Sequence, residues 1–472
     1  MRAYLASSIA VSCAAVLALP LSLAGPAAAT GPTVLTPGPP AAPATPPVQP
    51  AMPGTNPSTN PSPDPSPDAD TRAGAAVGEV AGSTQSLPLG PLAAAGPSTR
   101  VLGGAAAPAE RGLNRQDVSP FSLVGVVWDD VHTPLRGTVQ VRTRATGSGV
   151  WSDWQSVETH NDEHGADPGT AEGHSGALRG ATAPLWVGDS DGVEVRVRPE
   201  AGGTEQAPPL PAGLRLDLVD PGPEPAAAPQ NRAIKPAAAL AAPAGLTELP
   251  ALTRAQTLAT LPAAAAKAKP YIGPRPKIIT RKGWGADERM REKGFVYTKT
   301  IKAVFVHHSA TGNRYTCRQA PSILRSIYRY HVKSSGWRDF GYNFAVDKCG
   351  NIYEGRAGGV TKPVMGAHTL GFNTNSMGIA VLGSYGGTTP PAAAVTAVAR
   401  LTAWKLGLHG VNPKAKTYLT SGGGNLYKKG RKVKFNVIAG HRDGFATECP
   451  GKRLYGKLGT ARTASAKLQG RR

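Results

Sequence analysis

Residues 301–310 read IKAVFVHHSA, an apolar and β-branched run that ends on the paired histidines His307 and His308. Such a run predicts a buried strand that carries the two imidazoles at its end. Residues 433–440 read VKFNVIAG and predict another strand, which is followed directly by His441. Both predicted strands therefore deliver a histidine at their ends.

The residues between these two strands alternate between helical and extended patterns. Residues 342–356 predict two strands joined by a turn, residues 377–385 predict a further strand, and residues 390–408 predict a helix opened by proline. An earlier helix has apolar residues at helical spacing on one side. That side comprises Ile323, Leu324, Ile327, Tyr328 and His331. We therefore predict an α/β domain over residues 277–460, with helices packed on a mixed central β-sheet, followed by a basic tail over 461–472.

The chain before this domain divides by composition. Residues 97–220 contain short alternating runs separated by Gly, Asp and Pro, which predict a small all-β domain, most simply a sandwich. Its tryptophans could form a carbohydrate platform or belong to the core. Residues 30–96 and 221–276 are rich in Pro and Ala, so we expect a disordered segment and a linker there.

The first 29 residues have the pattern of an export signal. Arg2 precedes an apolar stretch over residues 9–23, and small residues at 27–29 predict cleavage before Thr30. No later stretch is apolar and long enough to span a bilayer. We expect a secreted protein, extracellular or associated with the cell wall, without a stable membrane anchor.

The formal net charge is +21, and basic residues gather toward the end of the chain. For an exported protein this charge favours an anionic surface, such as wall polymers, over nucleic acid. The alternative is ordinary solvated surface charge.

His307, His441 and Cys449 offer two imidazoles and a thiolate, and Cys449 follows His441 by eight positions. Three such ligands would leave one coordination position of a tetrahedral Zn²⁺ open for water, which is the catalytic pattern. By spacing alone, each histidine could instead be a satisfied core or surface group, and Cys449 a free buried thiol.

Four longer stretches resemble one family. These are VFVHHSAT (304–311), GWRDFGYNFAVDKCGNIYEGR (336–356), GAHTLGFNTNSMGIAVLG (366–383) and GHRDGFATECPG (440–451). In this order they resemble the peptidoglycan recognition and type 2 N-acetylmuramoyl-L-alanine amidase family. The resemblance implies hydrolysis of the amide between muramic acid and L-alanine in peptidoglycan.

The resemblance also implies roles for single residues. His307, His441 and Cys449 match the zinc ligands, whereas His308 is not carried over. Tyr342 matches the catalytic tyrosine, and Thr447 the position that threonine or lysine fills in active members. The groove for the muramyl peptide would be lined by His331, Trp337, His368 and Asn373. Members that bind without cleaving typically lack the cysteine, so Cys449 favours an enzyme.

Cys317 and Cys349 flank the predicted helix, and in an exported protein we expect them to form a disulfide. Cys449 then remains for the metal. Two other functional classes stay open at this point. One is a module that binds peptidoglycan without cleaving it, and the other is a structural protein attached to the wall.

Overall fold

The computed structural model describes residues 80–92, 110–159, 161, 163–200, 208–224, 246–261 and 271–472. All of these belong to one compact unit, Ala75–Arg472. The predicted signal over 1–29 lies outside the described residues, as does most of the 30–96 segment. Among the helices of the described ranges, none combines the length and apolar character that a bilayer crossing requires.

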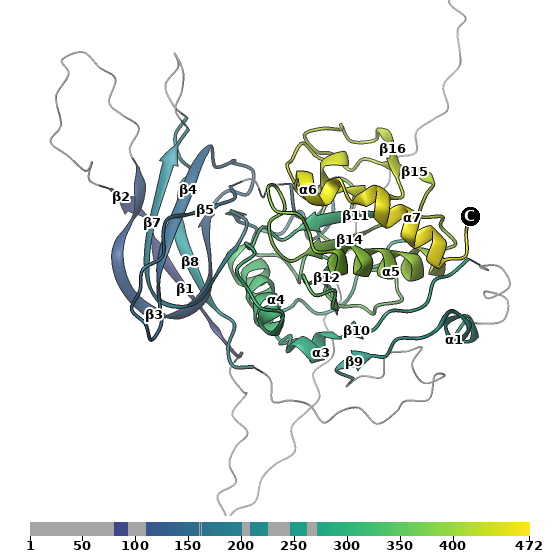
Figure 1. The fold of residues 1–472 in the computed structure, drawn as a ribbon. Coiled ribbons are helices and arrows are strands. Elements are labelled where there is room, and N and C mark those ends of the chain that lie inside the picture. The colour runs from purple at the N-terminus through teal and green to yellow at the C-terminus, as the bar shows by residue number, and fades with distance from the viewer. Residues whose placement is uncertain are drawn as a thin grey trace, which may run out of the picture. The chain divides into compact units, whose positions relative to one another are not determined.

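The β domain is a single antiparallel sheet with strand order β1-β8-β3-β7-β4-β5, and β2 and β6 also pair with β3 (Figure 1). Its strands are β1 (Ser83–Pro88), β2 (Gly90–Pro91), β3 (Arg111–Trp128), β4 (Gly137–Ala145), β5 (Gln155–Val157), β6 (Gly180–Ala181), β7 (Leu185–Pro199) and β8 (Arg215–Asp220). Side chains alternate along β4, where Val139, Val141 and Thr143 are buried between more exposed neighbours.

The expected all-β domain is confirmed, but its strands form one curved sheet instead of two separate ones. β3 pairs with β7 along most of its length and with β8 near its end, and its register shifts at several points. Such irregularities bend a strand, so one long strand closes over the core. Trp128 belongs to this core, and Trp186 is buried in the cluster that the β domain shares with α4 (Ala320–Arg329), whereas arginine guanidinium groups cover the rings of Trp151 and Trp154.

The prediction that residues 30–96 are disordered is wrong for β1, because Ser83–Pro88 pairs along its whole length with β8. The short run STQSLP has little apolar character of its own, and the partner strand supplies the backbone hydrogen bonds that order it.

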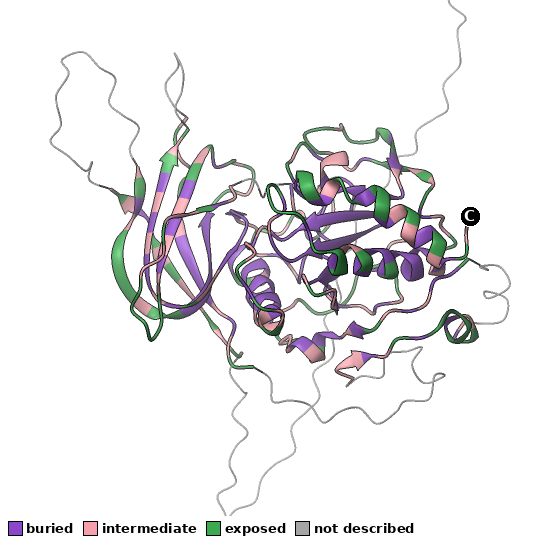
Figure 2. Ribbon diagram, in the orientation of Figure 1, coloured by how far each residue is buried: buried purple, intermediate pink, exposed green. Residues whose placement is uncertain are grey.

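The C-terminal domain has a seven-stranded mixed sheet with the order β17-β11-β14-β12-β13-β10-β9 (Figure 1). Its strands are β9 (Glu248–Leu249), β10 (Ile278–Ile279), β11 (Ala303–His308), β12 (Phe344–Val346), β13 (Ile352–Glu354), β14 (Ser376–Val381) and β17 (Ile438–Gly440). β11 runs parallel to both β14 and β17 at the centre. Every residue of β11 and β14 is buried, as Figure 2 shows. The predicted α/β fold with a mixed central sheet is confirmed.

Helices cover both faces of this sheet. α5 (Ala392–Leu408) and α7 (Leu458–Leu468) share one core cluster with Val304 and Val306 of β11. α4 (Ala320–Arg329) joins a second cluster with Ala345 and Ala380. α4 continues into a π-helical turn, Tyr330–Ser334, that carries His331. The remaining short helices are α1 (Arg254–Ala259), α3 (Arg281–Trp284) and α6 (Lys452–Tyr455), with 3₁₀ turns at Cys317–Gln319 and His441–Asp443.

Three predicted boundaries differ from the structure. The single strand over 433–440 divides into β16 (Lys432–Asn436), which pairs with β15 (Lys416–Thr420), and β17 in the central sheet. The linker over 221–276 contains β9 and α1, because β9 pairs with β10. The basic tail over 461–472 is mostly α7, whose small buried residues pack on α5.

The predicted disulfide between Cys317 and Cys349 is confirmed, with the two Cα atoms 6.3 Å apart and a sequence separation of 32 residues. Closing a loop of this length stabilises the fold by about 3 to 4 kcal/mol in the chain-entropy model. We expect the double variant Cys317→Ala/Cys349→Ala to unfold at a lower guanidinium concentration, followed by tryptophan fluorescence. Chemically reduced wild-type protein is the control, and an unchanged unfolding midpoint would contradict the assignment.

Candidate active site

The predicted metal ligands meet at one end of the central sheet. His307 is near the end of β11, His441 follows β17, and Cys449 lies on the loop that comes next. The ring centroids of the two histidines are 4.4 Å apart, and Cys449 Sγ is 3.8 Å from His307 Nδ1. All three side chains are fully buried.

Strand alternation explains why His307, and not His308, belongs to this cluster. Successive side chains point to opposite faces of a strand, so His307 follows Phe305 and lies opposite Val306. His308 instead accepts a hydrogen bond from the backbone N–H of Tyr385 and lies 3.5 Å from a carboxylate oxygen of Glu158.

Burial sets the protonation states of the cluster. It lowers the pKa of His307 and of His441 well below the usual value, so both rings are neutral and keep a lone pair for a ligand. Burial also raises the pKa of the Cys449 thiol well above its usual value. A cation bound here would hold the deprotonated form, because metal binding displaces the thiol proton.

The donor set fits a zinc ion. Within the described part of the chain, both ring nitrogens of His441 are buried without a hydrogen bond of normal geometry. Buried polar atoms rarely stay unpaired unless an ion or water satisfies them. Two imidazoles and one thiol at this spacing match the ligands that Zn²⁺ takes in catalytic sites.

A third histidine, His164, joins this cluster as its fourth residue, which the sequence did not predict. One ligand atom from each of His164, His307, His441 and Cys449 can be chosen so that all four lie within 4.8 Å of one another. His164 comes from the β domain, between β5 and β6. Its neighbours in the sequence show no metal-ligand spacing, so sequence reasoning had no signal for it.

Tyr342 lies beside the cluster, just before β12, with its ring centroid 5.2 Å from that of His307. Burial raises its pKa well above the usual value, and a deprotonated Cys449 would add to this shift. Its phenol therefore stays protonated and can donate a hydrogen bond. The Thr447 hydroxyl accepts a hydrogen bond from the Cys449 backbone N–H, with 3.0 Å between Oγ1 and N.

Comparison with known proteins gives the context of this site. A family profile described as N-acetylmuramoyl-L-alanine amidase matches residues 297–452, and one described as Rv3811 N-terminal galactose-binding domain-like matches residues 71–230. Peptidoglycan-recognition protein SC2 of Drosophila melanogaster is 32% identical over 185 residues, which cover 39% of this chain and 85% of that protein. The chain belongs to the peptidoglycan-recognition protein and amidase family.

Two further members of the family are similar to this chain. The N-acetylmuramoyl-L-alanine amidase of Homo sapiens is 30% identical over 189 residues, which cover 39% of this chain and 28% of that protein. The solved Drosophila PGRP-LB structure is 26% identical, with a TM-score of 0.31, and the match covers 39% of this chain and 92% of that one.

The predicted groove residues of the amidase-family domain lie close to the cluster. The His368 ring centroid is 5.3 Å from that of His307, and Asn373 Oδ1 accepts a hydrogen bond from the His368 backbone N–H. The rings of His331 and Trp337 stack with their centroids 4.4 Å apart. His331 Nδ1 also accepts from the Gly341 backbone N–H, next to Tyr342.

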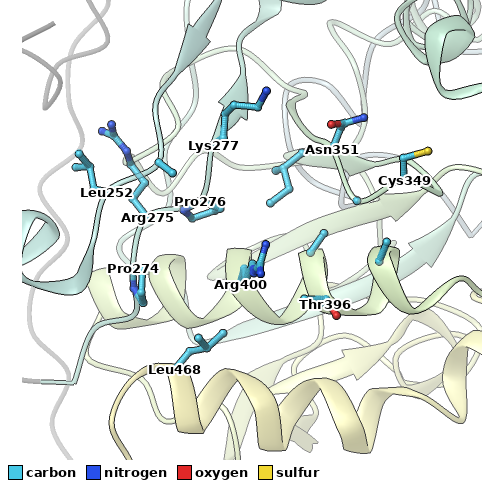
Figure 3. A pocket seen from close by; sticks show the side chains of 15 residues that line it. Leu252, Pro274, Arg275, Pro276, Lys277, Cys349, Asn351, Thr396, Arg400 and Leu468 are labelled. Carbon is cyan, nitrogen blue, oxygen red and sulfur yellow. The ribbon is translucent and has the colours of Figure 1, made fainter. Parts of the chain in front are cut away.

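A separate cavity of about 580 Å³ lies between α5 and the region around β10 (Figure 3). Leu252, Arg275, Asn351 and Arg400 are among its lining residues, and none of the four cluster residues reaches it. Its lining offers no group of metal ligands, so the candidate active site remains the histidine and cysteine cluster.

Proposed function

We propose that this protein is an exported, zinc-dependent N-acetylmuramoyl-L-alanine amidase that hydrolyses the bond between muramic acid and L-alanine in peptidoglycan. The observation that carries the proposal is the buried cluster of His307, His441 and Cys449 in a domain of the amidase family. The human relative bears the name of this activity. The predicted export signal and the basic residues near the C-terminal end are consistent with a substrate in an anionic cell wall.

Each side chain of the site would have a separate role in the reaction. His307, His441 and Cys449 would hold the zinc ion, which when bound polarises the scissile carbonyl and lowers the pKa of a bound water toward ~7. The protonated phenol of Tyr342 can donate a hydrogen bond to the oxygen that gains negative charge as the carbonyl is attacked. The hydroxyl of Thr447, which contacts the Cys449 backbone, can do the same or orient the attacking water.

Groove residues would position the substrate. The stacked rings of His331 and Trp337 offer an apolar and aromatic wall beside Tyr342. His368 is buried beside His307, and its Nε2 makes no hydrogen bond within the described residues. A polar atom of a bound muramyl peptide could satisfy it.

The second candidate is a module that binds peptidoglycan without cleaving it. Binding alone does not require two neutral imidazoles and a thiol around one point. The presence of Cys449 in the cluster therefore favours the enzyme.

The full mature chain tests the proposal. We expect one zinc per chain by elemental analysis after zinc loading, and stem peptides with a free L-alanine amine after long incubation with purified cell wall, detected by mass spectrometry. Because residues near His164 contact the site, a His164→Ala variant is assayed in parallel. Wall binding without released peptide in both proteins would overturn the amidase proposal in favour of the binding module.

A further inference from the structure

Residues 163–183, which we call the 163–183 segment, lie against the candidate active site. The His164 ring centroid is 4.6 Å from that of His441, 5.4 Å from that of His307 and 5.8 Å from that of Tyr342. The His164 side chain is only 6% exposed, and within the described chain neither ring nitrogen has a hydrogen-bond partner. A buried imidazole without a hydrogen bond, grouped with His307, His441 and Cys449, can take an ion held by those residues as its partner.

A fourth ligand would change the chemistry of the site. Catalytic zinc sites have three protein ligands and an open position, whereas sites with four protein ligands are closed. With His164 as the fourth ligand, the position that the attacking water needs is taken.

The neighbours of His164 bind two of the other residues assigned to catalysis and substrate binding, Thr447 and Asn373. The Thr447 hydroxyl donates to Glu163 Oε1 over 2.7 Å, so it is already engaged. Asn373 donates its side-chain amide to Asp167 Oδ1 over 2.6 Å and to the Gly165 carbonyl over 2.8 Å. Asp167 Oδ1 also accepts from the backbone N–H groups of Gly371 and Asn373.

A buried ion pair anchors the same segment. The Glu172 carboxylate accepts two hydrogen bonds from the Arg356 guanidinium, each 2.8 Å long, and the two side chains are 3% and 5% exposed. Charge-assisted bidentate pairs of this kind fix geometry as well as contributing energy. The segment therefore has a defined position on the domain.

The cavity beside His164 is too small for a substrate. The cavity lined by His164, His331 and Tyr342 has a volume of about 10 Å³, on the order of what a single water occupies. A muramyl peptide cannot enter unless the 163–183 segment moves.

We propose that His164 is a fourth protein ligand of the metal and that the 163–183 segment is a built-in inhibitor of the amidase, displaced when the enzyme meets its substrate. The inference rests on the proposed function, which supplies the metal and the substrate groove. Activation then requires His164 to leave the metal and water to take its place.

The ligand assignment is tested without any turnover. The full chain is loaded with Co²⁺, and its visible spectrum is recorded with and without acetohydroxamate, a small ligand for open metal positions. We expect no spectral response in the intact chain and a clear one in His164→Ala. The matched control is His174→Ala, because His174 lies exposed in the same segment and should leave the spectrum unchanged. An equal response in the intact chain and His164→Ala would overturn the assignment.

Inhibition is tested by cleavage of purified cell wall. If the segment is displaced in a few per cent of molecules, releasing it raises the rate about tenfold or more. We expect this increase for His164→Ala at saturating zinc. A second variant, Asp167→Ala, keeps His164 but removes the contacts with Asn373, and we expect it to raise the rate as well. Unchanged or lower rates in both folded variants would overturn the inhibitory role.

The two proposals fail in different ways. If no variant cleaves the wall but the hydroxamate response still depends on His164, the fourth ligand stands and the amidase function is overturned. If the intact chain cleaves as fast as His164→Ala, the amidase stands and the inhibitory segment is overturned.

Discussion

Cys449→Ser is expected to remove bound zinc and to lower the rate of wall cleavage by at least about 10³-fold, equivalent to about 4 kcal/mol of transition-state stabilisation. The thiol is fully buried beside His307, and a serine hydroxyl is a far poorer zinc ligand than a thiolate. Elemental analysis measures the zinc, and mass spectrometry measures the released stem peptides.

The comparison is made in the intact chain and in the His164→Ala background, so that inhibition by the 163–183 segment does not mask the loss. The double variant Cys317→Ala/Cys349→Ala is the control, because it removes cysteines that form the disulfide and not the cluster. It should keep its zinc. A Cys449→Ser protein with full zinc and full activity would exclude the proposed metal centre.

Tyr342→Phe is expected to keep one zinc per chain and to lower kcat about 10²- to 10³-fold with little change in KM, because its phenol would donate a hydrogen bond only where charge develops. The ring remains, so its contacts with His307 and His331 persist. Steady-state kinetics on soluble muramyl peptides, in the His164→Ala background, measure the effect.

Tyr353→Phe is the matched control for this prediction. Tyr353 is also buried, and its hydroxyl donates to Asp347 at the end of β12, away from the cluster. We expect it to lower stability by about 1 kcal/mol and to leave kcat unchanged. A Tyr342→Phe enzyme with wild-type kcat would show that the tyrosine only packs.

The elements around β11 show how much of the site could be predicted from the sequence. An apolar run that ends on histidine, the helical spacing of Ile323, Leu324 and Ile327, and the two strands around the Lys348 turn all follow from local periodicity. Each of these elements buries one face against its neighbours, so its pattern of apolar residues is visible in a short window. The resemblance of the sequence motifs to the family then implied that His307, His441 and Cys449 are metal ligands.

Other boundaries depended on partners far along the chain. β1 has an unremarkable sequence and is ordered because β8, more than a hundred residues later, pairs with it. The run over 433–440 looks like one strand, yet its two halves pair with β15 and β11 in different sheets. Strand pairing is a property of two segments together, and one segment read alone does not reveal it.

By itself the sequence predicted the two folded domains, the disulfide and the elements that carry them, and its resemblance to the family implied the metal ligands His307, His441 and Cys449. Only the tertiary structure decided that His164 joins the cluster and that Glu163, Asp167 and Glu172 bind Thr447, Asn373 and Arg356, respectively. The physical reason is that His164 lies in a polar loop without periodicity, more than a hundred residues before His307. Its contacts with the site form where the β domain packs on the C-terminal domain. The apolar pattern of a short segment shows only which face of that segment is buried, and it does not show which distant residues lie against that face.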